Sequence, residues 1–292
     1  MEKEIKLVNK VKRLLKRLGC PRWLHHYGPK KYEFLHHLCA LLMRFFCKLS
    51  YRRIIQLFDL LGITCPSKSA LQYTAAKLDS SFWQKVLKAT SGQAYLVALD
   101  STGFSRTNPS YHYLKRINGA MPKVPVKASV SFDTRKKKFC AAKIRVTPAH
   151  DIKDAKFLLQ QSKPKIAVAD KAYNSENLFE FAHKQNILLM VPEKSNAKRG
   201  FFRKKMQKKF RLKTYYRREI VEAGNSSIKR KFGSSVSSKK AQTIRSEIYG
   251  RLTCHNIFSL IFRLLGQSRF FVRLFEKRID FHKIYKTNKL LQ

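Results

Sequence analysis

The sequence predicts an α/β fold, in which a mixed sheet is flanked by helices and preceded by an all-helical region. Three patterns support this. Much of residues 1–91 carries apolar side chains at helical spacing, residues 124–146 alternate apolar and polar side chains, and residues 151–191 alternate helical patterns with short apolar runs. A meander of strands followed by alternating helices and strands gives a mixed sheet with helices on its faces.

The charge of the chain indicates a polyanionic partner. There are 62 Lys and Arg residues against 18 Asp and Glu, a formal net charge of +44 over 292 residues. Cations set against phosphates release condensed counterions, so we expect tight and salt-dependent binding to DNA or RNA. A hydrophobic fraction of 44%, with 21 Phe and 12 Tyr, supplies a packed core and argues against a disordered basic tail.

The six cysteines indicate neither a zinc ribbon nor a disulfide framework, because no two of them form a C-x2-C pair. We expect reduced thiols in a cytosol. His36, His37 and Cys39 lie in an apolar run of helical character and lack the paired spacing of a structural zinc site. No signal peptide opens the chain, and its longest apolar runs are short and interrupted by arginines, so we expect neither secretion nor a membrane partner.

Residues 1–91 are predicted to form a helical DNA-binding region that contains a pair of short helices. Ser50 is placed to cap a helix that Gly62 ends, and Ser67 to cap a second helix. The pair resembles a helix-turn-helix, whose second helix would enter a major groove while the first contacts phosphates. A plain helical hairpin that supports the core is the alternative, because the pair has no diagnostic residue. The candidate DNA contacts are Arg52, Arg53, Lys68, Gln72 and Lys77.

A catalytic domain is predicted over residues 92–240. Its first strand is an apolar run that ends in Asp100, and a later strand stops at Asp170. Between them we expect two alternating strands joined by a turn at 133–135, and then a helix that Asp151 caps. After Asp170 the pattern predicts a helix over about 175–184 and a strand over 187–191.

Residues 193–214 interrupt this pattern with ten Lys or Arg residues and three interleaved Phe. We expect a basic arm that follows a DNA backbone, and a solvated run of charges is the alternative. Beyond Gly233, a segment rich in Ser and Lys is interpreted as a linker to C-terminal helices over 241–292 that pack on the catalytic domain. The candidate DNA contacts of the arm are Arg203, Lys204, Lys205, Lys208, Lys209 and Arg211.

The clearest catalytic signal is the segment that contains Tyr215, Arg218, Glu222 and Lys229 at the spacing Y-x2-R-x3-E-x6-K. On a helix with about 100° per residue, these side chains share one face. An acid beside cations suits a carboxylate that holds a metal ion next to groups that hold a phosphate. The alternative is a surface helix in which Arg218 and Glu222 form an i,i+4 ion pair.

Three acids from distant parts of the chain are expected to converge. Asp100 and Asp170 end strands, Glu222 lies on a later helix, and the expectation is that all three reach a shared pair of divalent ions. Clustered carboxylates repel one another unless a metal relieves the repulsion. Taken singly, each Asp could instead be a strand-end cap or turn residue.

With these residues, the chain resembles the DDE-type insertion-sequence transposases with a ribonuclease-H-like core, in the branch whose third acid lies in Y-x2-R-x3-E-x6-K. The segments D-S-T-G-F from Asp100, H-D from His150 and A-D-K-A-Y from Ala169 come in the family's order. The resemblance covers about residues 95–233 well and the N-terminal helices loosely.

The resemblance implies Asp100, Asp170 and Glu222 as the catalytic and metal-binding acids. It implies two Mg²⁺ or Mn²⁺ ions as cofactors, and double-stranded DNA, both element ends and target, as the partner of a homodimer in the cytoplasm at the nucleoid. Metal-activated water would cut a strand at the element's end, and the freed 3′-hydroxyl would attack target DNA. The alternatives are a non-catalytic sequence-specific DNA-binding protein and a structure-directed ribonuclease-H-like nuclease.

The resemblance also implies helper roles around the acids. Arg218 and Lys229 would hold a phosphate and Tyr215 would contact a distorted nucleotide, with Lys171 and Tyr173 as further helpers. Gly224 departs from the family pattern. Because a glycine inside a helix costs about 1 kcal/mol relative to Ala, a kink or helix end there would move Lys229 off the shared face.

Overall fold

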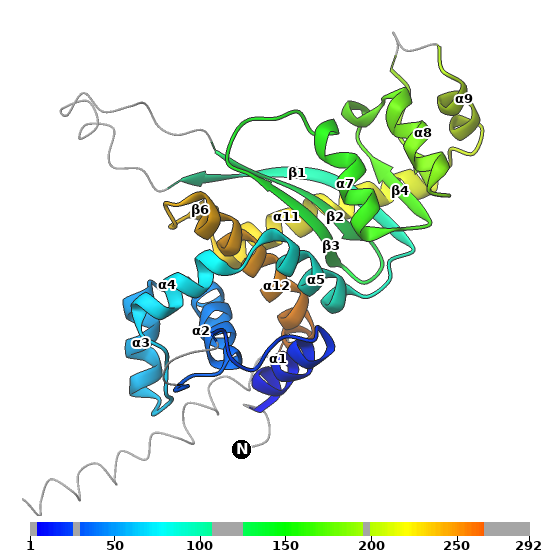
Figure 1. Ribbon diagram of the computed structural model, residues 1–292. Coiled ribbons are helices and arrows are strands. Elements are labelled where there is room, and N and C mark those ends of the chain that lie inside the picture. Colours follow the sequence, from blue (N-terminus) through cyan, green and yellow to red (C-terminus); the bar gives the residue numbers. More distant parts are fainter. Residues whose placement is uncertain (1–4, 26–29, 107–124, 195–198, 266–292) are drawn as a thin grey trace, which may run out of the picture. The chain divides into compact units, whose positions relative to one another are not determined.

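The structure is a computed structural model that describes residues 5–25, 30–106, 125–194 and 199–265 (Figure 1). The chain divides into a compact unit over Met1–Asn256 and a second unit over Ile257–Gln292. Of the second unit, only the end of one helix is described, so the part of the C-terminal helices expected over 241–292 that follows residue 265 lies outside the described residues. Within the described residues, no helix combines the length and apolarity that a bilayer crossing requires.

The N-terminal part is all-helical, as the sequence predicts. Ser50 Oγ accepts a hydrogen bond of 3.2 Å from the N–H of Arg53, and Ser67 Oγ accepts one of 3.3 Å from the N–H of Ala70. Both expected N-caps are therefore confirmed, and they set the start of the two short helices. The helices are α1 (Ile5–Arg17), α2 (Phe34–Phe46), α3 (Tyr51–Leu60), α4 (Lys68–Lys77) and α5 (Ser80–Ser91).

A mixed sheet follows, with the strand order β3-β2-β1-β4-β5. β2 pairs antiparallel with β1 and β3, whereas β4 runs parallel to β1 and β5. This meander followed by parallel strands is the ribonuclease-H-like arrangement that the resemblance implies. The strands are β1 (Leu96–Arg106), β2 (Val126–Asp133), β3 (Lys138–Arg145), β4 (Ile166–Ala169) and β5 (Leu188–Met190).

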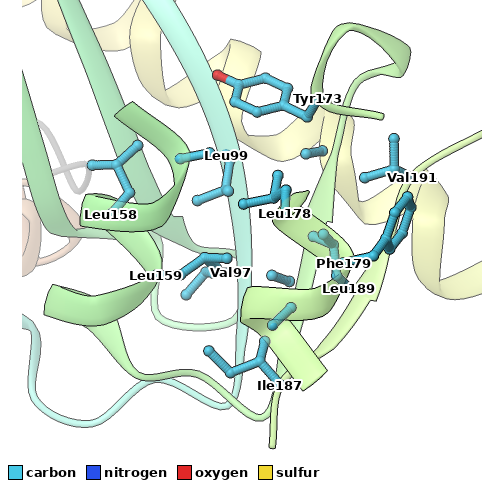
Figure 2. Packing of buried hydrophobic residues seen from close by; sticks show 14 of the residues in the cluster. Val97, Leu99, Leu158, Leu159, Tyr173, Leu178, Phe179, Ile187, Leu189 and Val191 are labelled. Carbon is cyan, nitrogen blue, oxygen red and sulfur yellow. The ribbon is translucent and has the colours of Figure 1, made fainter. Parts of the chain in front are cut away.

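One face of the sheet is covered by α7 (Ile152–Ser162) and α8 (Glu176–Lys184) over a continuous apolar cluster. Figure 2 shows Val97 and Leu99 of β1 packed among Leu159 of α7 and Phe179 of α8. Because side chains alternate along a strand, Leu99 faces this cluster and the next residue, Asp100, faces the other way. That other face carries α11 (Glu219–Phe232).

The long helix α12 (Ala241–Leu265) ties the helical region to the sheet through residues up to 256. Ser246 Oγ donates to the carbonyls of Ala75 and Leu78, at 2.6 and 3.1 Å. Asn256 pairs with both backbone groups of Phe139, with hydrogen bonds of 2.9 and 2.8 Å. Since β3 is an edge strand, this contact also satisfies backbone groups that could otherwise pair with another chain.

Two details of the sheet differ from the sequence prediction. β1 does not end at Asp100 but continues to Arg106, because β2 pairs with it as far as Phe104. The segment expected to be a linker forms β6 (Ser235–Val236), which pairs in parallel with Ser105 and Arg106. Backbone pairing of this kind is not visible in a composition rich in Ser and Lys, and it anchors the chain between α11 and α12.

Candidate active site

Asp100 lies near the centre of the sheet and is half-buried. Its Oδ2 accepts a hydrogen bond of 2.9 Å from Asn225 Nδ2 on α11. Burial raises the pKa of Asp100; the Ser101 N–H, Asn225 and the charge of Arg218 oppose the rise, and the charge of Glu222 adds to it. The carboxylate of Asp100 thus lies within the electrostatic field of Glu222.

Asp170 follows β4 directly, as the sequence predicts. Leu99 and Ala169 are register partners on parallel strands, so Asp100 and Asp170 are the next residues along two adjacent strands. Asp170 is exposed, and its Oδ1 accepts a hydrogen bond of 2.7 Å from the N–H of Lys171. It therefore caps the short 3₁₀ turn Lys171–Tyr173, which is the local role weighed as the alternative for each Asp.

Glu222 lies in the first turn of α11, and its Oε1 forms an ion pair of 2.8 Å with Arg218 Nη1. The i,i+4 pair considered as the alternative is therefore present. Burial alone lowers the pKa of Arg218, but the negative charges of Glu222, Tyr215 and Asp170 outweigh it, so the pKa is raised. Arg218 is thus a cation that interacts with both Glu222 and Asp170.

The segment from Tyr215 to Lys229 is not one uniform helix. α10 (Leu212–Tyr215) and a 3₁₀ turn (Tyr216–Arg218) precede α11. The half-buried Tyr215 packs against Phe210 with ring centroids 5.5 Å apart. Lys229 Nζ lies 5.9 Å from the ring centroid of Phe104.

The kink or helix end considered at Gly224 is absent, because α11 runs through it to Phe232. A Cβ at Gly224 would stand 2.9 Å from Cζ of Phe132 on β2, which is closer than real contacts allow. The glycine therefore lets the helix approach the sheet, and Lys229 stays on the same helix as Glu222. The departure from the family pattern is a packing feature.

Lys171 and Tyr173, expected as helpers, differ in exposure. Lys171 is exposed, whereas Tyr173 is only 1% exposed and packs in the apolar cluster beside Leu99 and Leu178 (Figure 2). Burial, together with the charges of nearby acids, raises the pKa of the Tyr173 hydroxyl. The ring of Tyr173 is a core element in this structure and is not open to a nucleotide.

Asp100, Asp170 and Glu222 are not arranged as a ready-made metal site in this structure. Among the described residues, no three His, Cys, Asp or Glu side chains stand close enough together to hold a metal ion. Asp100 is bound to Asn225 and Glu222 to Arg218, so each carboxylate has a protein partner. The donor types nevertheless fit Mg²⁺, which prefers carboxylate and amide oxygens, and Oδ1 of Asn225 is buried without a partner in the described part of the chain.

Sequence reasoning missed two features of this region. Asn225 lies about 60° from Glu222 around α11, so its position three residues after the acid could have indicated a contact at the site. Asp151 does not cap α7 through its side chain, and its Oδ1 instead accepts a hydrogen bond of 2.8 Å from Ser101 Oγ and an ion pair from Lys127. Ser101 and Lys127 come from the paired strands β1 and β2, and Asp151 comes from the turn before α7, so only the tertiary fold brings these three residues together.

The candidate helix-turn-helix presents the expected side chains to solvent. Leu71, Thr74 and Ala75 of α4 are buried, so the opposite side of that helix is free. Lys77 Nζ donates to the carbonyl of Leu24 at 3.2 Å, which holds it near the helix surface. The exposed candidates are Arg52, Arg53, Lys68, Gln72 and Lys77.

The segment expected to be an arm is partly folded. It forms α9 (Phe201–Gln207) and α10, with Met206 buried, while residues 195–198 lie outside the described part. Arg203 Nε donates to Asn174 Oδ1 at 2.9 Å, so this guanidinium takes part in the fold. The other candidates are exposed, namely Lys204, Lys205, Lys208, Lys209 and Arg211.

Comparison with known proteins gives a family match over this part of the chain. A family model described as "Transposase DDE domain" matches residues 91–257. No curated protein matches the sequence.

Two solved structures are similar at low identity. The piggyBac transposase synaptic complex with hairpin DNA shares 11% identity over 90% of this chain and 73% of that chain, with a TM-score of 0.45. The Mos1 transposase paired-end complex with left transposon end shares 12% identity over 85% of each chain, with a TM-score of 0.23.

Proposed function

The chain belongs to the transposase DDE domain family, whose members are DNA transposases that transfer phosphoryl groups, and from this membership we propose how its residues perform the reaction. Asp100, Asp170 and Glu222 are proposed as the catalytic acids. The observation that carries this assignment is the position of Asp100 on β1 and of Asp170 directly after the adjacent parallel strand β4, with α11 holding Glu222 within electrostatic reach of Asp100.

DDE transposases generally use divalent metals, and we propose two Mg²⁺ or Mn²⁺ ions held by these acids. Such ions would activate the attacking oxygen and stabilise charge on the phosphate. The protein's part is to present hard oxygen donors, of which Asp100 is half-buried and is oriented by Asn225. With such an ion bound, Glu222 would help to hold it in place of its pairing with Arg218, and the guanidinium would then be free to contact a phosphate.

The helper residues follow the same geometry. Arg218 and Lys229 are proposed to hold phosphates beside the acids, since both lie on the segment that carries Glu222. Tyr215, half-buried beside Phe210, offers an aromatic surface to a nucleotide. The match of all four residues to Y-x2-R-x3-E-x6-K supports membership of that transposase branch.

The proposed substrate is double-stranded DNA at the ends of a transposable element, bound by a homodimer at the nucleoid. The freed 3′-hydroxyl then attacks target DNA. The net charge of +44, together with exposed cations on α3, α4 and α9, supports a DNA partner.

The test combines cleavage and binding. Purified protein is incubated with Mg²⁺ or Mn²⁺ and DNA that carries the inverted repeats flanking the gene. Asp100→Asn, Asp170→Asn and Glu222→Gln should each lower cleavage by at least about 10³-fold while DNA binding survives. Asp59→Asn, a change at an exposed aspartate on α3, is the matched control and should cleave normally.

Each other outcome has its own meaning. Near-normal cleavage by one acid variant would remove that residue from the site. Wild-type protein that shifts the DNA without nicking it would be a non-catalytic binder, and cleavage without joined strand-transfer product would indicate a nuclease.

A further inference from the structure

A buried cluster of charges lies where α2, β6 and α12 meet. Arg44, Glu247 and Arg251 are only 4%, 2% and 6% exposed. Arg251 Nη2 lies 2.5 Å from Glu247 Oε1 and donates to the carbonyl of Ser235 at 2.7 Å, while Nη1 donates to the carbonyl of Gly233 at 2.9 Å. The polar hydrogens of Arg251 are thus largely taken up by Glu247 and the backbone around β6.

Glu247 is likewise fully engaged. Its carboxylate accepts hydrogen bonds from the N–H groups of Ser237 and Ser238, at 3.1 and 2.9 Å. Burial alone raises the pKa of Glu247, but Arg251, Ser238 and Arg44 outweigh it and leave the pKa lowered. The buried carboxylate of this cluster, Glu247, is therefore ionised and is paired with Arg251.

Arg44 is left without a carboxylate of its own in the described part of the chain. Its Nη2 donates to Ser237 Oγ at 3.1 Å, and its guanidinium lies 4.0 Å from the ring centroid of Tyr51. Its Nε is buried and has no hydrogen-bond partner among the described residues. Two buried guanidinium groups against one carboxylate leave one positive charge uncompensated, which is unfavourable unless an anion joins them.

A cavity of about 150 Å³ opens at this cluster, lined by Arg44, Lys48, Phe232 and Glu247 among others. One water occupies about 30 Å³ of liquid, so the cavity has room for a tetrahedral oxyanion. Lys48 is exposed at its edge, and its Nζ makes only a long contact of 3.4 Å to the carbonyl of Arg230. The cavity thus has an exposed cation at its edge and a buried cation in its wall.

We propose that this cavity, the Arg44 pocket, binds a phosphate group through Arg44 and Lys48. The phosphate comes either from a DNA backbone or from free phosphate in solution. The DNA source rests on the proposed function: Phe232 ends α11 ten residues after Glu222, about 15 Å along the helix, or roughly four base steps of a strand. A DNA strand bound at the acids would therefore span the distance to the pocket within roughly four nucleotides.

The first experiment needs neither DNA nor cleavage. The thermal midpoint of the full chain is measured in inorganic phosphate and in chloride at equal ionic strength. The wild type should gain several degrees in phosphate, because a ligand that binds only the folded state stabilises it. Lys48→Gln should lose at least half of that gain and Arg44→Met nearly all of it, whereas Lys85→Gln, a change at an exposed lysine on α5, should keep it.

The Lys85→Gln control is essential, because a chain of charge +44 gains some stability from any multivalent anion. Equal rises of the thermal midpoint in phosphate for Lys48→Gln and Lys85→Gln would overturn the proposal that the pocket binds phosphate. If Arg44→Met fails to fold, Lys48→Gln alone decides the matter. Failure here leaves the transposase proposal intact, since no catalytic residue is altered.

The second experiment separates the two sources of phosphate. The logarithm of the DNA binding constant is plotted against the logarithm of salt concentration for the same variants. A backbone phosphate in the pocket predicts a slope smaller by about 0.9 for Lys48→Gln and an unchanged slope for Lys85→Gln. Equal slopes, with the phosphate-dependent stabilisation still lost in Lys48→Gln, assign the pocket to free phosphate.

Discussion

Asn225 Nδ2 donates a hydrogen bond of 2.9 Å to Asp100 Oδ2 and so joins α11 to the central strand at the first proposed catalytic acid. Asn225 is 6% exposed, and its Oδ1 is buried without a partner in the described residues. The amide therefore fixes one oxygen of the carboxylate and leaves its own oxygen available to a ligand.

Replacing Asn225 should weaken metal binding before any chemistry. Removal of a hydrogen bond to a charged group costs about 1.5–3 kcal/mol, so Asn225→Ala should lower Mg²⁺ affinity by about tenfold or more. The pKa of Asp100 should rise further, since Asn225 now lowers it. Calorimetric Mg²⁺ titration checks the affinity, and an NMR titration of the carboxyl checks the pKa. Unchanged Mg²⁺ affinity would show that Asn225 is only a packing residue, and Asn177→Ala, at an exposed position on α8, is the control.

The contact between Gly224 and Phe132 predicts an unusual helix mutation. Alanine favours helices over glycine by up to about 1 kcal/mol, yet a Cβ here would stand 2.9 Å from the Phe132 ring. We expect Gly224→Ala to destabilise the protein by about 1–3 kcal/mol in denaturant unfolding, because α11 must move away from the sheet.

The matched test is a double-mutant cycle with Phe132→Leu, a smaller side chain on β2. If the clash is the cause, the double variant should recover at least half of the loss attributed to Gly224→Ala. Additive effects of the two changes would show that the glycine has another role.

The sequence predicts most of the elements but not how they are joined. The caps at Ser50 and Ser67 and the succession of strands and helices along the chain follow from local chemistry, so they could be predicted. The continuation of β1 past Asp100 depends on pairing with β2 and β6, and both partners lie far away in sequence. The core position of Tyr173 is likewise a tertiary effect, because its neighbours come from several elements.

At the candidate site, the sequence context suggests the three acids, which remain a proposal, but it does not indicate all of the partners that the structure gives them. The ion pair of Glu222 with Arg218 follows from i,i+4 spacing, whereas the bond from Asn225 to Asp100 requires the approach of α11 that Gly224 permits.

His255 should make stability depend on pH. Burial lowers its pKa from 6.5 to about 4, with the carbonyl of Lys137 opposing the shift and Lys231 and Lys138 adding to it. The ring packs against Phe132 and Phe139, so the neutral form is favoured in the folded state. Because the unfolded chain binds the proton more tightly, this stability is fully present above about pH 6.5 and is lost as the pH falls toward about 4.

The size of the effect follows from the shift. About 2.5 pKa units correspond to about 3 kcal/mol, to be measured as the decrease in unfolding free energy between pH 7 and pH 4. His255→Gln should flatten this part of the pH profile relative to His150→Gln, a change at an exposed histidine. An identical slope for both variants would assign the pH dependence to other groups.

The basic segment around α9 should contain two kinds of cations, those that bind DNA and those that stabilise the fold. Lys204, Lys205 and Lys208 are exposed, whereas Arg203 is hydrogen-bonded to Asn174. Changing the three lysines together to Gln should reduce the salt slope of DNA binding by about 2–3, at about 0.9 per phosphate contact, with little effect on the thermal midpoint.

Arg203→Gln should do the reverse. It should lower the thermal midpoint, because the loss of its guanidinium leaves Asn174 Oδ1 without that donor and weakens the contact between α9 and the turn that precedes α8. The salt slope should stay close to that of the wild type. A triple change at Lys85, Lys88 and Lys153, all exposed and outside the segment, is the control for net charge. If this control reduces the salt slope as much as the triple change around α9, DNA binding depends on the total charge of the protein, and the basic segment is a solvated run of charges.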